Sequence, residues 1–278
     1  MNSPNISIIT PVFNNIKYIE QCIQNVIRQN CQEIEHLIID GGSSDGTAEF
    51  IQQATFQHSH IRFISEPDSG QSNAMNKGIR MAAGEYIGFL NVDDYYEPEA
   101  LNEVIKILHN YPSEFIVGNC NVWLPNNVLQ YVNKPSKLKP YHLLSGFYLP
   151  VNPSAYFYKK SIHQLAGFYN ESNHFNMDIE FLIQASLITK IHYVNRTFGN
   201  FRLLENTKTV SDLEAGSLEI RKNELYSKFI ERANLRIRIL TQIVKIQRKS
   251  HRKLLKIKKK IFLPFNMVYY KLIKLLNA

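Results

Sequence analysis

Short apolar runs alternate with segments of helical periodicity along the first 110 residues of the chain. Each run is rich in isoleucine, leucine or phenylalanine, which is typical of strands that are buried on both faces of a sheet. We assign strands to residues 6–10, 36–40, 61–65 and 86–90. Between them, apolar side chains recur every three or four residues, so the pattern predicts helices between the strands. Strands and helices that alternate in this way favour right-handed βαβ units and a mostly parallel sheet with helices on both faces.

The pattern changes beyond residue 110. Residues 115–118 and 121–131 are strand-like, and the Pro-Asn-Asn sequence at 125–127 favours a hairpin turn. Further on, the pattern predicts a strand, a helix and a second strand, over residues 155–158, over about 177–187 and near His192.

Glycine and proline nearly vanish after residue 216, where the pattern becomes helical and basic until Pro264 interrupts it. Residues 216–278 hold 17 Lys and Arg against 3 Asp and Glu, a net charge of +14, whereas the whole chain carries +8. We therefore predict an α/β domain over 1–215, with halves 1–110 and 111–215, and a basic amphipathic helical tail over 216–278. Such a tail is typical of proteins that meet an anionic surface, and we expect a membrane surface here.

The composition excludes several classes of protein. No apolar run approaches the ~20 residues of a membrane-spanning helix, and the first five residues lack the pattern of a signal peptide. The three cysteines have no CxxC spacing and no clustered histidines, so neither a disulfide framework nor a zinc site is indicated. We expect the protein in a reducing cytoplasm.

Polar residues follow each of the four predicted strands, at 10–14, 40–43, 66–71 and 91–94. In a parallel α/β sheet the carboxyl ends of the strands form the ligand-binding crevice, so we expect these segments to converge. Asp93 and Asp94 repel one another unless a cation or hydrogen-bond donors compensate, and Mg²⁺ takes one or two carboxylates plus substrate phosphates. A solvated helix start that favours acidic residues is the alternative for this pair.

The known phosphate-binding and nucleophile motifs are absent from the sequence. No GxGxxG follows the first strand and no GxxxxGK[ST] occurs, so dinucleotide and P-loop sites lose their main support. No GxSxG occurs either, which argues against a hydrolase triad.

Six segments resemble the family-2 inverting glycosyltransferases of the bacterial surface-polysaccharide type, which have the GT-A fold. The matching segments occur in the family's order over roughly residues 5–210, at 8–14, 37–47, 66–78, 84–94, 152–168 and 177–181. The resemblance implies that 1–110 binds a nucleotide-sugar and that 111–215 binds the acceptor.

The resemblance also implies roles for individual residues of the donor half. Thr10, Pro11 and Asn14 would lie along the base and ribose, with Asp40 near the base. Gln71, Asn73 and Lys77 would line the donor pocket. Asp93 and Asp94 would hold the ribose and a Mg²⁺ or Mn²⁺ ion on the diphosphate. Two departures are visible: Gly41 stands where the family has a second Asp after Asp40, and Asn91 replaces the first Asp of the metal motif.

In the acceptor half, Asp178 matches the family's catalytic base, and Glu180 at the same helix start remains the alternative. Arg202 resembles a late family motif that approaches the diphosphate, with a structural ion pair as the alternative. A carboxylate base suits this chemistry because the acceptor hydroxyl is a poor nucleophile until its proton is removed.

The resulting expectation is an inverting transferase that moves a sugar from a nucleotide-sugar, expected to be a UDP-sugar, to a saccharide or polyprenyl-linked acceptor. It would act in surface-polysaccharide biosynthesis, peripheral on the inner face of the cell membrane, without a nucleic-acid partner. The alternative is a non-catalytic, membrane-associated scaffold of the same fold that binds a sugar or nucleotide.

Overall fold

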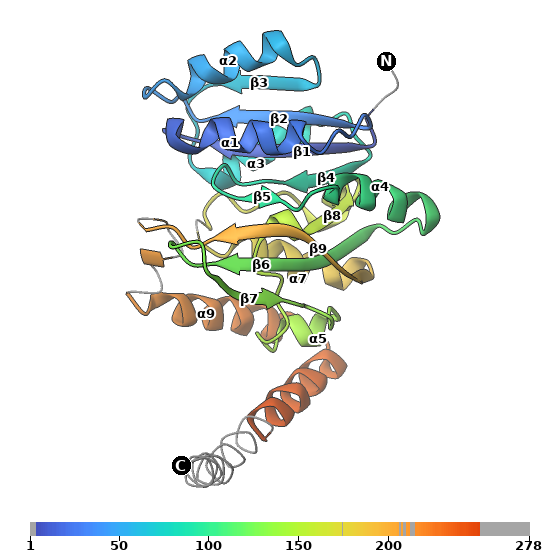
Figure 1. The fold of residues 1–278 in the computed structure, drawn as a ribbon. Helices are drawn as coiled ribbons and strands as arrows, with labels where there is room; N and C mark the ends of the chain where they lie inside the picture. Colours follow the sequence, from blue (N-terminus) through green and yellow to red (C-terminus); the bar gives the residue numbers. More distant parts are fainter. Residues whose placement is uncertain (1–3, 174, 206, 208–209, 212–214, 251–278) are drawn as a thin grey trace, which may run out of the picture.

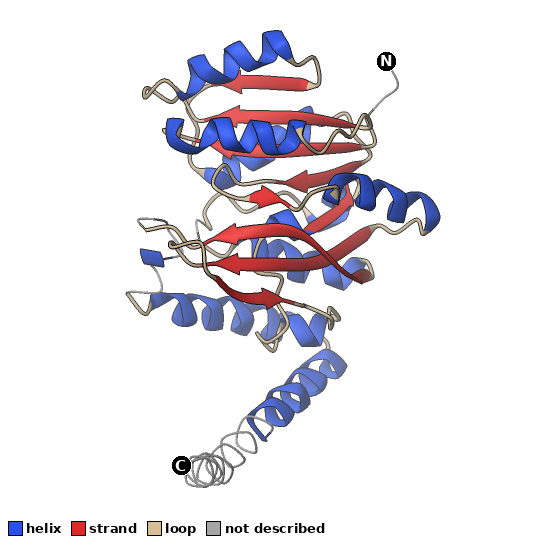
Figure 2. Cartoon of the chain, viewed as in Figure 1, coloured by secondary structure: helices blue, strands red, loops and turns tan. Residues whose placement is uncertain are grey.

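The computed structural model describes residues 4–250 except 174, 206, 208–209 and 212–214, and its centre is one nine-stranded sheet (Figures 1 and 2). The strands run in the order β3-β2-β1-β4-β8-β6-β9-β5, and β7 pairs with β6. Their bounds are β1 (Ile6–Val12), β2 (Ile34–Asp40), β3 (Ile61–Ser65), β4 (Tyr86–Phe89), β5 (Tyr95–Tyr96), β6 (Phe115–Trp123), β7 (Leu129–Asn133), β8 (Tyr156–Lys159) and β9 (Ile191–Arg202).

Strands β1 to β4 are mutually parallel, as the alternation of strands and helices predicts. Mixed pairing begins at β8, which is antiparallel to both β4 and β6, while β6 and β9 are parallel. The α/β class is therefore confirmed, and the sheet is continuous across both halves of the predicted domain.

Helices cover both faces of the sheet. Their bounds are α1 (Ile16–Ile27), α2 (Thr47–Gln57), α3 (Gln71–Met81), α4 (Ala100–Asn110), α5 (Pro140–Leu143), the 3₁₀ helix η1 (Pro153–Ala155), α6 (Ile162–Ala166), α7 (Met177–Ile188) and α9 (Ser217–Arg232). Because side chains alternate across a strand, Ile8 packs with α1, α2 and α4 on one face, and Ile9 packs with α3 and α7 on the other. Two separate hydrophobic clusters result, one on each side of the sheet.

Strand β6 differs from the two pieces that the sequence pattern predicts, because it is one continuous strand through Gly118. Its register against β9 shifts on both sides of Asn119. A Cβ atom at Gly118 would lie 2.4 Å from the ring of Phe198, so only glycine lets the two strands approach here. The glycine that interrupts the apolar pattern therefore marks an irregularity within one strand.

The first part of the predicted tail packs on the α/β core. Leu225 and Tyr226 of α9 are buried in the same cluster as α3 and α7 (Figure 1). The chain is again helical over 235–250, and Ile237 packs against that cluster. Pro264 and the rest of the predicted basic tail, residues 251–278, lie outside the described residues. Among the residues that the structure describes, no helix has both the length and the hydropathy needed to cross a bilayer.

Candidate functional site

The carboxyl ends of β1 to β4 lie side by side at one end of the sheet, and the polar loops that follow them form a surface that we call the strand edge. Val12, the last residue of β1, is level with Asp40 at the end of β2, and Asp40 is level with Ser65 at the end of β3. Backbone hydrogen bonds extend this alignment past the strands, since the Gly41 N–H donates to the Val12 carbonyl at 2.9 Å and the Glu66 N–H to the Asp40 carbonyl at 3.0 Å. Sequence segments that are far apart therefore form one continuous loop surface.

Asp40 is fully buried and organises this surface from beneath. Its carboxylate accepts hydrogen bonds from the Gly42 N–H at 3.1 Å, the Ser43 N–H at 3.0 Å and the Ser65 hydroxyl at 2.5 Å. The Ser43 hydroxyl is a fourth donor. The carboxylate oxygens are thus engaged by the protein's own loops, which fixes the backbone of 41–43.

Thr10 and Pro11 are also buried, within strand β1. The Thr10 hydroxyl lies 2.9 Å from Nε2 of His36, whose pKa burial lowers to about 3, so that imidazole is neutral. Asn14 has a left-handed backbone (φ 46°), and its side-chain oxygen accepts a hydrogen bond from the Ser44 N–H at 2.9 Å. These three predicted residues therefore shape the strand edge, and Thr10 faces the interior.

Phe13 is an additional candidate at this edge. It lies between the buried end of β1 and Asn14, yet 60% of its side-chain surface is exposed. Aromatic side chains beside a few polar groups commonly line ligand sites. Hydrophobic patterning alone could not single it out, because it continues an apolar strand.

Helix α3 carries the three other residues predicted for the donor pocket, and each is tied to a different neighbour. The Gln71 amide donates to Oδ1 of Asn91 at 3.1 Å. The Asn73 amide donates to the Glu171 carboxylate at 2.8 Å, and Lys77 pairs with Glu66 at 2.8 Å. Helix α3 thereby joins the loops after β3 and β4 to the segment that precedes α7.

Asp94 is buried and accepts hydrogen bonds from three separate elements. The donors are the side-chain amides of Asn91 at 3.0 Å and Asn152 at 2.8 Å and the backbone N–H of Arg202 at 3.1 Å. Burial, and secondarily the charge of Asp93, raises the pKa of Asp94 to about 7. The carboxylate thus joins β4 to η1 and the end of β9, a role that sequence analysis does not indicate for it or for Asn152.

Asp93 is partly exposed, and burial raises its pKa while the Arg202 charge lowers it. Arg202 donates from Nε to the Asp93 backbone carbonyl, and its guanidinium lies over the ring of Tyr18 at 5.0 Å and over that of Tyr95 at 5.8 Å. In the described part of the chain, no side chain donates a hydrogen bond to the Asp93 carboxylate itself. The arrangement holds the Arg202 guanidinium at the backbone of Asp93, where its charge acts on the Asp93 carboxylate.

The donor set suits a divalent cation shared with a phosphate ligand. No group of three His, Cys, Asp or Glu side chains in the described residues could enclose a metal by itself. Mg²⁺ on a nucleotide needs only one or two protein carboxylates, because phosphate and water oxygens complete its shell. The Asp93 carboxylate meets this need, with Asp94 directly behind it in the chain.

Asp178 lies in the first turn of α7, where its Oδ1 accepts a hydrogen bond from the Ile179 N–H at 2.8 Å. Burial raises the pKa of Asp178, and the charge of Lys222 on α9 opposes the shift. The α7 terminus adjoins the start of α3, since the Ser72 hydroxyl lies 2.8 Å from the Met177 sulfur. The helix turn that carries Asp178, in the predicted acceptor half, therefore lies beside the start of α3, in the predicted donor half.

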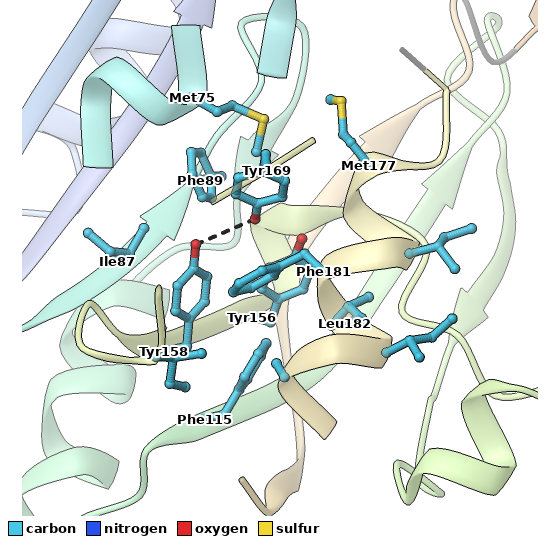
Figure 3. Close-up of a cluster of buried hydrophobic side chains, with 14 of the residues drawn as sticks. Met75, Ile87, Phe89, Phe115, Tyr156, Tyr158, Tyr169, Met177, Phe181 and Leu182 are labelled. Carbon is cyan, nitrogen blue, oxygen red and sulfur yellow. Dashed lines mark hydrogen bonds between the residues drawn. The ribbon is translucent and has the colours of Figure 1, made fainter. Parts of the chain in front are cut away.

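An aromatic cluster supports the start of α7 (Figure 3). Tyr156, Tyr158 and Tyr169 pack around Phe181, with ring centroids of Tyr158 and Phe181 4.8 Å apart, and the hydroxyls of Tyr158 and Tyr169 are 3.4 Å apart. Glu180, the alternative base, accepts a hydrogen bond from the Asn173 amide at 2.7 Å. Asp178 therefore accepts a hydrogen bond from the backbone, whereas Glu180 accepts one from a side-chain amide.

The sequence of the chain is similar to glycosyltransferases of bacteria. The model of the glycosyl transferase family 2 matches residues 7–177. A chondroitin synthase of Escherichia coli is 38% identical over 98 residues, which are 35% of this chain and 14% of that protein. The glycosyltransferase GlyG of Streptococcus pneumoniae is 29% identical over 41% of this chain and 38% of its own. The chain thus corresponds to only a part of the length of these relatives.

Solved structures share the fold at low sequence identity. S. aureus TarS 1–349 in complex with UDP-GlcNAc superimposes with a TM-score of 0.64 at 17% identity, over 82% of this chain and 72% of that one. The mannosyltransferase PcManGT from Pyrobaculum calidifontis, in complex with GDP-Man and Mn²⁺, gives 0.57 at 15% identity, over 89% and 81%. With the strand-edge site and the family match over residues 7–177, these findings show that the chain belongs to glycosyl transferase family 2 and has the GT-A fold.

Proposed function

We propose that this chain transfers a sugar from a UDP-sugar to a saccharide or polyprenyl-linked acceptor, with inversion at the anomeric carbon, in surface-polysaccharide synthesis. The observation that carries the proposal is the strand edge itself, where the Arg202 side chain donates to the Asp93 backbone carbonyl and its charge opposes the rise in the pKa of the Asp93 carboxyl. A diphosphate fits this pair, because Arg202 can neutralise its oxygens and Asp93 can share a cation with them. The TarS complex with UDP-GlcNAc adds support for a nucleotide-sugar donor.

In the proposed reaction, the acceptor hydroxyl attacks the anomeric carbon from the side opposite the diphosphate. The new C–O bond forms as the bond to the diphosphate breaks, the hydroxyl proton passes to the Asp178 carboxylate, and UDP leaves with the bonding electron pair. The buried setting that raises the pKa of Asp178 also makes it a stronger base than an exposed aspartate. A Mg²⁺ or Mn²⁺ ion held by Asp93 and Asp94 would stabilise the charge that develops on the leaving diphosphate.

The donor assignment is tested by incubating the chain with a panel of UDP-, GDP- and CDP-sugars in Mn²⁺ and measuring release of the nucleoside diphosphate. We expect release from at least one UDP-sugar and loss of release in excess EDTA. Tight binding of UDP without any release would favour the non-catalytic scaffold instead. Release from GDP- or CDP-sugars alone would refute the UDP assignment.

We also propose that the C-terminal helices place the enzyme on an anionic membrane, where a polyprenyl-linked acceptor would be found. Four apolar side chains on the 235–250 helix, each between 42% and 69% exposed, recur at helical spacing: Leu235, Ile239, Ile243 and Ile246. Basic residues lie among them, at Arg236, Arg238, Lys245 and Lys249. An apolar stripe flanked by cations suits the headgroup region of an anionic leaflet. The inner face of the cell membrane is the site we expect.

Vesicle co-sedimentation of the full chain tests this placement. Binding to vesicles that contain phosphatidylglycerol should exceed binding to pure phosphatidylcholine and should fall as salt rises. Ile239→Asn together with Ile246→Asn should weaken it, whereas Gln247→Asn, an exposed polar change on the same helix, should not. Equal binding by all three proteins would contradict a role for the stripe.

A further inference from the structure

Gly41 leaves a space at the strand edge that a side chain from another loop fills. A Cβ atom on Gly41 would lie 2.8 Å from Oδ2 and 3.1 Å from Cγ of Asp68, and 3.3 Å from Cδ2 of Phe13. The backbone of Gly41 lies outside the left-handed region, so its conformation does not require glycine. A side chain at position 41 would instead displace the Asp68 carboxylate, which is the end of a flexible side chain and occupies this space only because residue 41 is glycine.

One carboxylate oxygen of Asp68 accepts a hydrogen bond that holds the side chain in this position, and the other has no donor among the described residues. Its Oδ1 accepts a hydrogen bond from the Gly70 N–H at 2.8 Å, in the turn that leads into α3. Within the described residues, Oδ2 has no hydrogen-bond donor. Asp40, the neighbouring carboxylate, already accepts four hydrogen bonds from its own loops. Asp68 therefore supplies the carboxylate oxygen that remains for a ligand at this point of the edge.

Phe13 adds an apolar surface to the same space. Its ring borders the Gly41 position and is 60% exposed. The backbones on either side are fixed, because the Asn14 N–H donates to the Ser43 hydroxyl at 2.7 Å. Phe13 offers an exposed aromatic face, and Asp68 offers a hydrogen-bond acceptor without a donor. The two together fit a planar ring that stacks on Phe13 and donates an N–H group to Asp68.

We propose that Phe13, Gly41 and Asp68 form the slot that recognises the nucleobase of the donor, an inference that rests on the UDP-sugar function proposed above. Uracil stacks on Phe13 and donates its N3–H to Oδ2 of Asp68. Cytosine has an acceptor at the same ring position, so its lone pair faces the carboxylate and it binds less well. Asp68 is thus a specificity-determining residue. It supplies the carboxylate that Gly41 cannot supply.

The test compares the dissociation constants of UDP and CDP, measured by calorimetry on the full chain in Mn²⁺. Asp68→Asn keeps the acceptor for Gly70 but presents an amide N–H₂ to the ligand. We expect UDP to bind about 10- to 100-fold more weakly, as for loss of a hydrogen bond to a charged group, and the preference for UDP over CDP to collapse. Glu49→Gln, the same charge change at an exposed position on α2, should leave both constants unchanged.

A position swap provides a second, independent variant. Gly41→Asp alone should weaken UDP, since its Cβ would lie 2.8 Å from the Asp68 oxygen. Adding Asp68→Ser clears that space, keeps a hydroxyl to accept the Gly70 N–H and leaves one carboxylate in the slot. The double variant should therefore bind UDP more tightly than Gly41→Asp and again prefer it to CDP.

The binding of UDP and CDP by wild type and by Asp68→Asn distinguishes a wrong slot assignment from a wrong donor assignment. If the wild-type chain prefers UDP and Asp68→Asn retains that preference, the slot assignment is wrong and the donor assignment stands. If the wild-type chain binds neither UDP nor CDP, the donor assignment fails and the slot fails with it.

Discussion

Replacing Asp178 by Asn tests the base assignment with little disturbance of the fold. The Asn side chain keeps an oxygen for the Ile179 N–H, which Asp178 contacts at 2.8 Å, but it cannot take up a proton. Removal of a positioned general base typically slows the reaction ~10²–10⁴-fold, which corresponds to about 3–5 kcal/mol of activation free energy. Donor affinity should stay nearly constant, because the base acts on the acceptor proton.

The same variant has a stability signature that follows from the pKa of Asp178. Burial raises that pKa in the folded state above its value in the unfolded chain. The resulting stabilisation is fully present below the unfolded pKa and is lost as pH rises through the folded one. Asp178→Asn should therefore unfold at a higher temperature than wild type near pH 7, and the difference should vanish in acid. The transfer rate of wild type should fall as pH drops through the raised pKa.

Glu180→Gln is the matched control, since Glu180 lies on the same turn of α7. UDP release from the preferred donor gives the rate, and calorimetry gives donor affinity. A rate within about threefold of wild type for Asp178→Asn would refute the assignment, given the ~10²-fold minimum expected for a base. Loss of transfer in Glu180→Gln instead would make Glu180 the base.

Further predictions concern the metal pair, the sheet and α9. Asp93→Asn should abolish cation-dependent donor binding without lowering the unfolding temperature, and full donor binding by wild type in EDTA would contradict this. Asp94→Ala should abolish the same binding and also cost about 1–3 kcal/mol of stability, because it leaves three buried hydrogen-bond donors without an acceptor. Gly199→Ala should destabilise the fold by about 1–3 kcal/mol in denaturant titration, because its Cβ would lie 2.0 Å from a buried serine hydroxyl; an unchanged midpoint would refute this packing. Lys222→Met should raise the pKa of Asp178 and move the acid limb of the pH–rate profile upward, and an unmoved limb would exclude their electrostatic contact.

The first half of the fold follows from the sequence because β1, β2 and β4 are buried on both faces. Runs such as 6–10 and 36–40 are mostly apolar, and the structure extends them by only two residues, to β1 (Ile6–Val12) and β2 (Ile34–Asp40). The second half is less readable. Strand β9 (Ile191–Arg202) was predicted only near His192, because its middle is polar and partly exposed.

The site was predictable to the extent that topology determines it. Parallel strands bring their carboxyl ends together, so the convergence of the four polar segments follows from the alternation of strands and helices. The partners of each side chain do not follow. That Asp94 binds Asn152, or that Asp68 fills the space at Gly41, depends on contacts between loops distant in sequence. Periodicity carries no information about such contacts.

Release of UDP shows whether the strand edge around Asp93 binds a UDP-sugar and transfers its sugar. Wild type and Asp93→Asn would be assayed side by side with a panel of UDP-sugars, with Mn²⁺ and with EDTA. We expect release by wild type in Mn²⁺ from at least one donor, and none by wild type in EDTA or by Asp93→Asn. Equal release by both folded proteins, or none from any donor by wild type, would contradict this expectation.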